Sequence, residues 1–186
     1  AQHSDTAPVT VTAPALANVW INEFHYDNAG TDSGELVELA GPAGTSLAGW
    51  TLLAYNGADG AVYMTKALSG TFGNLQAGYG VLSFSWAGLQ NGAPDGFALV
   101  NASGQVVQFL SYEGTFTATG GAAAGMTSTA IPVSESEATV KGYSCQLQGT
   151  GDRYVEFTWV AGVRATAGKK NTGQTFAVAK ALVTRR

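Results

Sequence analysis

The chain has 186 residues, of which 12% are charged and 45% are hydrophobic, and its formal net charge at pH 7 is −4. No apolar run approaches the roughly 18 residues that a membrane-spanning helix needs, so we expect no membrane span. The negative charge disfavours direct nucleic-acid binding, which leaves a strong basic footprint on a protein. We therefore expect a single globular domain with no transmembrane helix.

The N-terminal part of the chain predicts a lead-in followed by a hairpin. Residues 1–17 contain Pro8 and Pro14 and indicate an extended segment, in which Val9–Thr12 could add as an edge strand. Val19–Tyr26 and Glu35–Ala40 are strand-like runs joined by a polar connector, Asp27–Gly34. The central domain therefore begins with a hairpin at about residue 18.

Short strands continue along the rest of the chain and are separated by turn signals such as Asn-Gly and Asp-Gly. The predicted strands are Trp50–Tyr55, Ala61–Thr65, Tyr79–Ser85, Phe97–Asn101, Gln105–Ser111, Gly142–Gln148 and Tyr154–Val160. Gly149–Asp152 supplies a predicted turn, and residues 177–186 form a tail or linker. About nine short strands without a long amphipathic helix predict an all-β sandwich over residues 18–176.

Aromatic residues lie in or beside these predicted strands. Burial alone accounts for that placement, so we expect them in the core; an aromatic cleft for sugar is the functional alternative. The core candidates are Trp20, Trp50, Trp86, Trp159, Phe24, Phe97, Phe109 and Phe157.

Several motifs, taken in order, resemble one known family. They are Ile21–Asn28, Glu35–Leu39, Leu47–Leu52, Gln90–Gly96, Gln108–Gly114 and Thr166–Gln174. Together they resemble bacterial lamin-tail-like domains, an immunoglobulin-like family often attached to secreted nucleases. The resemblance covers Asn18 to Phe176, and Ala167 departs from it where proline is expected. It implies an immunoglobulin-like β-sandwich that is secreted or exposed at the cell surface.

No complete catalytic set is present in the sequence. His3 and His25 are the only histidines, and there is no nucleophile elbow, P-loop or zinc-protease motif. The single Cys145 lies in a strand-like run and indicates a small buried side chain, with a reactive thiol as the alternative. We therefore expect that the protein is not an enzyme.

Carboxylates are concentrated in and around the first connector. Asp27, Asn28, Asp32 and Glu35 could offer hard oxygen ligands, which favour calcium, although their spacing differs from that of an EF-hand. Calcium is therefore a possible cofactor, and none is certain. Alternation places Glu23 on one strand face with Ile21 and His25, where Glu23 could instead be a buried structural acid.

The predicted function is a non-catalytic binding or targeting module. The resemblance implies that it positions an associated nuclease or hydrolase on a surface, an extracellular polymer or a partner protein, so that nucleic acid is met only through that nuclease. The expected contacts lie in the loops, at Trp86, Asn91, Asp95 and Tyr112. The alternatives are a structural domain that assembles through edge strands and a hydrolase that uses carboxylates such as Glu35 and Glu38.

Overall fold

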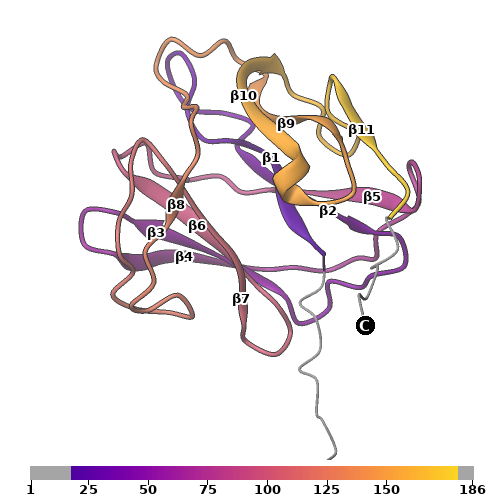
Figure 1. Cartoon of the computed structure of the whole chain (residues 1–186). Helices are drawn as coiled ribbons and strands as arrows, with labels where there is room; N and C mark the ends of the chain where they lie inside the picture. Colours follow the sequence, from indigo (N-terminus) through magenta and orange to yellow (C-terminus); the bar gives the residue numbers. More distant parts are fainter. Residues whose placement is uncertain (1–17, 180–186) are drawn as a thin grey trace, which may run out of the picture.

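The computed structural model describes residues 18–179, which form two β-sheets with a shared core between them (Figure 1). The first sheet has the order β10–β9–β1–β2–β5, with β11 beside β9. Its strands are β1 (Trp20–His25), β2 (Leu36–Pro42), β5 (Tyr79–Ser85), β9 (Tyr143–Gly151), β10 (Phe157–Arg164) and β11 (Gln174–Phe176).

The second sheet has the order β4–β3–β6–β7–β8. Its strands are β3 (Thr51–Asn56), β4 (Ala61–Ala67), β6 (Asp95–Val100), β7 (Val106–Tyr112) and β8 (Thr129–Ala130). A 3₁₀ turn, η1 (Tyr154–Glu156), precedes β10. The prediction of an all-β protein is confirmed, and within residues 18–179 no helix is long and apolar enough to cross a membrane.

The three predicted hairpins are present as antiparallel pairs: β1 with β2, β3 with β4, and β6 with β7. The turn between β3 and β4 needs glycine at Gly60, where φ is +70° and a Cβ atom would overlap the Thr117 carbonyl oxygen. The predicted edge strand Val9–Thr12 lies outside the described residues.

Some boundaries differ from the prediction. The predicted turn at Gly149–Asp152 is wrong in part, because β9 continues to Gly151 with β10 and β11 hydrogen-bonded on its two sides. The predicted strand Tyr154–Val160 begins instead with η1 and becomes extended only at Phe157. The strands β8 and β11 were not predicted, since two or three residues are too short to show an alternating pattern.

The core confirms the aromatic prediction. The Phe24 ring lies within the core, and its centroid is 5.4 Å from that of Phe97 and 5.3 Å from that of Trp159. Because Phe97 belongs to the second sheet, its contact with Phe24 joins the two sheets. The eight predicted aromatic side chains are all buried, with exposed fractions between 1% and 8%. Cys145 is also fully buried, as predicted, and burial raises the pKa of its thiol.

A bulge in β1 decides which residues face the core. The register against β2 shifts between Ile21 and Glu23, so that Ile21 and Phe24 both lie in the hydrophobic core. The prediction that Glu23 shares a face with Ile21 is therefore wrong. Glu23 and His25 lie on the outer face of β1, where other segments cover them.

Candidate functional site

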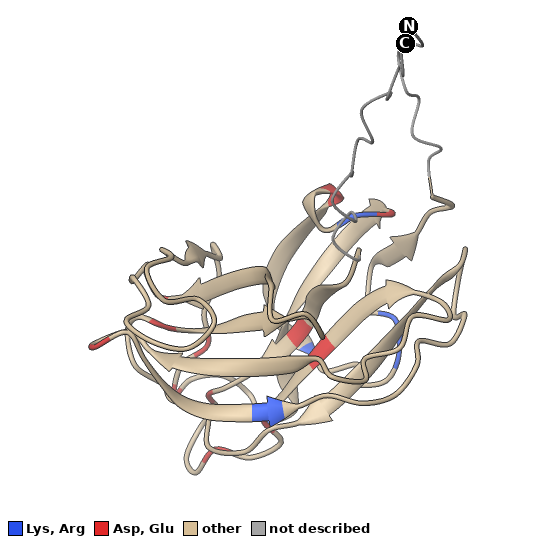
Figure 2. Cartoon of the chain, turned by 90° about the horizontal axis from the view of Figure 1, so that it is seen from below, with Lys and Arg blue, Asp and Glu red and all other residues tan. Residues whose placement is uncertain are grey.

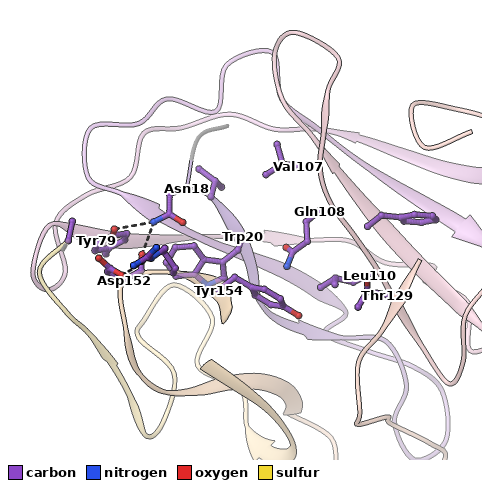
Figure 3. A pocket seen from close by; sticks show the side chains of 13 residues that line it. Asn18, Trp20, Tyr79, Val107, Gln108, Leu110, Thr129, Asp152 and Tyr154 are labelled. Atoms are coloured by element: carbon purple, nitrogen blue, oxygen red, sulfur yellow. Dashed lines mark hydrogen bonds and ion pairs between the residues drawn. The ribbon is translucent and has the colours of Figure 1, made fainter. Parts of the chain in front are cut away.

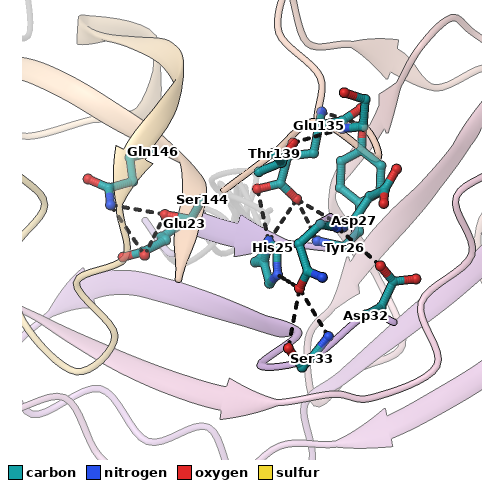
Figure 4. A network of polar contacts seen from close by, with 12 residues as sticks. Glu23, His25, Tyr26, Asp27, Asp32, Ser33, Glu135, Thr139, Ser144 and Gln146 are labelled. Atoms are coloured by element: carbon teal, nitrogen blue, oxygen red, sulfur yellow. Dashed lines mark hydrogen bonds and ion pairs between the residues drawn. The ribbon is translucent and has the colours of Figure 1, made fainter. Parts of the chain in front are cut away.

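A buried ion pair joins β1 to the long segment 113–139 (Figure 4). His25 Nδ1 lies 3.0 Å from each carboxylate oxygen of Glu135, and Nε2 lies 3.2 Å from Asn28 Oδ1. The Asn28 amide nitrogen donates to the carbonyls of Ala29 and Thr31, which directs its oxygen toward the ring. Both ring nitrogens thus face acceptors, which is the arrangement that an imidazolium requires.

The charge on His25 depends on Glu135. Burial acts to lower the pKa of His25, but the hydrogen bond and charge of Glu135 outweigh it, and the pKa is raised. Glu135 also accepts from the backbone N–H groups of Tyr26 and Asp27, at 2.7 and 3.1 Å. This carboxylate therefore holds segment 113–139 against the end of β1. Sequence inspection missed it because no pattern links Glu135 to His25, which lies 110 residues away.

The connector after β1 is held by its own hydrogen bonds. Asp32 accepts from Asn28 N at 3.1 Å and from Asn91 Nδ2 at 2.9 Å, and the Asn91 bond holds the pKa of Asp32 below its usual value. Asp27 is 6% exposed, and its Oδ1 atom is buried without a hydrogen-bond partner. Burial, and then the charge of Asp32, raise the pKa of Asp27. The pKa values of these two neighbouring carboxyl groups are therefore shifted in opposite directions.

The four predicted metal ligands do not converge. Glu35 accepts from the backbone N–H groups of Gly88 and Leu89, at 2.9 and 2.7 Å, while Asn28 Oδ1 is used by His25 and the connector. Across residues 18–179, no group of three or more His, Cys, Asp or Glu side chains is arranged to hold a metal ion. Because calcium takes six to eight oxygen ligands, this arrangement is not a preformed calcium cage.

The four predicted binding residues divide by exposure. Trp86, Asp95 and Tyr112 are buried, at 4%, 2% and 1% exposure, so they are placed to support the loops rather than to present a contact surface. Asp95 accepts from Gly57 N and Gly92 N. Among the four, only Asn91 is exposed. A hollow of about 390 Å³ does lie in this loop region.

A second buried cluster surrounds Glu23. Glu23 Oε1 accepts from Ser144 Oγ and Thr166 N, both at 2.8 Å, and Oε2 accepts from Thr166 Oγ1 at 2.7 Å. Across the β1–β2 ladder, Glu38 accepts from Asn22 Nδ2 and from Gly168 N. Burial, and then the charge of Glu23, raise the pKa of Glu38 to about 8. The prediction that Glu23 is a buried structural acid is confirmed, although most of its donors are side chains.

Three of the sequence motifs meet in this cluster. Ile21–Asn28 supplies Asn22 and Glu23, Glu35–Leu39 supplies Glu38, and Thr166–Gln174 covers them. Asn171 donates to the carbonyls of Asn22 and Leu147. Three of the six motifs on which the resemblance rests are thus joined by one network of buried hydrogen bonds.

An open groove of about 650 Å³ lies between the sheets on another side of the molecule (Figure 3). One wall is formed by β7 and Thr129, and the other by Trp20, Tyr79 and the segment 152–154. Asn18 Nδ2 closes one end by donating to Tyr79 Oη and to the Asp152 carbonyl. This volume lies within the roughly 300–1,000 Å³ range of ligand pockets.

Gln108 joins the two walls of this groove. Its Oε1 atom accepts from the Ile21 N–H at 2.8 Å, across the gap between the sheets. Sequence inspection did not single out the groove, because its lining comes from segments far apart in the chain. The available signal was Gln108 itself, an amide that interrupts the apolar run Val106–Leu110.

No family model, curated protein or solved structure matches this chain. The resemblance to lamin-tail-like domains thus stays a prediction that rests on the motifs quoted above.

Proposed function

We propose that the chain is a non-catalytic binding module of the lamin-tail-like kind, with an immunoglobulin-like sandwich, secreted or exposed at the cell surface. Its role is to position an associated nuclease or other hydrolase on a polymer, surface or partner protein. The observation that carries the proposal is the open groove between the sheets, which is lined mainly by uncharged side chains. Binding sites of this concave, largely apolar form are common in proteins.

The state of the acids and of His25 supports a role without catalysis. The His25 ring is 2% exposed, and both of its nitrogens are occupied by Glu135 and Asn28. Glu23 and Glu38 are fully buried beneath segment 166–174 and accept hydrogen bonds there. A general acid or base must reach the proton that it transfers, and these side chains face protein groups.

Exposed apolar side chains flank the groove. Val155 is 82% exposed and follows the lining residue Tyr154, while Val178 is 75% exposed and precedes the lining residue Ala179. In the proposed binding mode these two side chains extend the apolar surface beside the groove. Figure 2 shows Lys and Arg at separate places along the described fold, which favours an uncharged ligand over a polyanion.

The proposal is tested by retention of the full chain on immobilised chitin, cellulose, peptidoglycan and DNA, and on an array of extended peptides. We expect retention on at least one of these ligands, and a loss of at least tenfold in affinity for the double variant Val155→Lys/Val178→Lys. Val140→Lys is the matched control, since Val140 is also exposed, at 60%, but is not adjacent in sequence to any residue that lines the groove.

Two results would contradict the proposal. One is hydrolysis of any of these ligands by the purified chain, which would make it an enzyme. The other is equal retention of the wild-type chain and the groove variant, which would place the binding surface elsewhere.

A further inference from the structure

The groove exposes the edge of a β-strand. The backbone of β7 pairs with β6 on one side, with a register shift that leaves Val107 without a partner residue in β6. On the other side, β8 pairs only with Leu110 and Ser111. Within residues 18–179, no strand pairs with the outer edge of β7 over Val106–Phe109. An edge of this kind offers unpaired N–H and C=O groups to another chain.

This edge coincides with the groove. Val107, Gln108, Phe109 and Leu110 all line it, and Val107 and Gln108 are half-buried rather than covered. Figure 3 shows Val107, Gln108 and Leu110 facing the same opening as Trp20 and Tyr154. A ligand in the groove would therefore meet the β7 backbone on one side and apolar side chains on the other.

The chemistry of the lining favours a polypeptide over a sugar. Sugar sites usually present several aromatic faces, but Trp20, Tyr79 and Phe109 are only 2%, 4% and 6% exposed, and among the aromatic lining residues only Tyr154 is half-buried. Charge is confined to one end, where Arg153 Nε lies 3.3 Å from Asp152 Oδ1. The remaining lining residues are uncharged, so the complementary ligand is a neutral chain.

We propose that the groove binds an extended, uncharged polypeptide, which adds as a strand to the free edge of β7 and continues the sheet beside β8. The proposal rests on the proposed function and names the class of its partner. β8 shows that the same edge already accepts a strand, with Leu110 opposite Thr129. Main-chain hydrogen bonds provide affinity in such complexes, and alternate side chains provide specificity.

The test is a titration of the full chain with a capped peptide of alternating valine and threonine, about eight residues long, followed by calorimetry and by amide exchange. We expect saturable binding and at least tenfold slower exchange of backbone amides within Val106–Phe109. Val107→Lys, which places a charge in the groove, is expected to weaken binding at least tenfold. Val140→Lys is the matched control, because Val140 is 60% exposed and lies outside both β7 and the groove lining.

Two methylated peptides test strand addition on the wild-type chain, whether or not the variants fold. One peptide carries N-methyl groups on its odd-numbered residues and the other on its even-numbered residues. In an added strand only one of these two sets of N–H groups faces β7, so one peptide should lose binding and the other should keep its affinity within threefold. Equal binding of the two sets would overturn strand addition.

Other occupants give distinct results. A dimer in light scattering that Val107→Lys abolishes would assign the edge to a second copy. Slow exchange of the β7 amides in the free chain, lost in Val107→Lys, would assign it to the chain itself. Either result overturns the proposal of a separate peptide partner. If the peptide fails to bind while Val155→Lys/Val178→Lys still loses polymer retention, only the partner class is wrong and the proposed function stands.

Discussion

Glu23 and His25 lie two residues apart on the outer face of β1, yet their surroundings neutralise buried charge in different ways. Around Glu23 the second carboxylate, Glu38, has its pKa raised to about 8, so that a proton removes one negative charge at neutral pH. Around His25 the carboxylate of Glu135 is balanced by an imidazolium. The Glu23 cluster therefore depends on the protonation of Glu38, whereas the His25 cluster depends on the ion pair between His25 and Glu135.

The two clusters share a structural role despite this difference. Both are covered by a segment that is distant in sequence, 166–174 over Glu23 and 113–139 over His25, and both use their carboxylates to hold that segment. Buried acids with a raised pKa are often taken as signs of catalysis, although structural networks shift pKa values as well. Here the acids close the fold, and the groove remains open.

The dependence of stability on pH gives the largest expected effect. The pKa of Glu38 is raised from 4.5 to about 8, so its contribution is complete below pH 4.5 and is lost as the pH rises through 8. The difference corresponds to roughly 5 kcal/mol at most. Urea unfolding at several pH values should show stability falling over this range. Glu38→Gln, a neutral isostere, should flatten the fall, and a variant as steep as the wild type would contradict the assignment.

Replacement of the other carboxylate in this cluster should also be costly. Glu23→Gln removes a carboxylate that accepts from Ser144 and Thr166, so we expect a loss of about 3–5 kcal/mol in the free energy of unfolding. Glu137→Gln, at an exposed position, is the control and should change stability by less than about 0.5 kcal/mol. Equal losses in the free energy of unfolding for Glu23→Gln and Glu38→Gln at pH 7 would contradict the expectation that the two carboxyl groups contribute differently to stability.

The ion pair should show a smaller and more local effect. His25→Phe leaves Glu135 buried without its cation, and two backbone N–H groups still solvate the carboxylate, so we expect a loss of about 2–3 kcal/mol. Amide exchange should quicken most at Tyr26 and Asp27. A double variant with Glu135→Gln should cost less than the sum of the single changes. Additive costs would show that the pair does not act as a unit.

Substitutions in the connector, Asp27–Gly34, should have the smallest effect on stability. Asp27→Asn removes a buried carboxylate whose pKa is raised, so above the pH range in which Asp27 titrates the variant should be more stable than the wild type in urea unfolding, by less than about 1 kcal/mol. Millimolar calcium should move the thermal midpoint by less than about 1 °C, because the predicted ligands do not converge on one point within residues 18–179. A larger shift that Asp27→Asn abolishes would establish the calcium site predicted from the sequence.

Much of the fold could be predicted from local patterns. The alternation in Phe97–Asn101 and Gln105–Ser111, with a glycine-containing turn between them, predicts the β6–β7 hairpin closely. The bulge at Asn22 could not be predicted, because alternation alone cannot indicate where one residue is added to a strand. That single residue explains why Ile21 and Phe24 both reach the core.

The candidate site was harder to predict than the fold. Trp86 and Tyr112 lie in loop-rich surroundings, which suggested contact residues, but packing buries them: Tyr112 stacks on Tyr26 with ring centroids 3.9 Å apart. The groove requires β7 to lie opposite the start of β1 and residues 152–154, a proximity that arises only from tertiary packing. Local sequence carries little information about such long-range contacts.

The sheet topology has a consequence for the order of folding. In the second sheet, β3 pairs with β4 and β6 pairs with β7 as local hairpins, and all four strands lie within residues 51–112, which also contain β5 of the first sheet. The first sheet needs β1 to meet β9, where Glu23 and Gln146 are separated by 123 residues. Contacts between residues so far apart in the sequence form slowly, because a long loop must close first. During synthesis the second sheet can therefore assemble early. The edge of β1 that pairs with β9, at Glu23 and Phe24, remains unpaired until β9 has been synthesised.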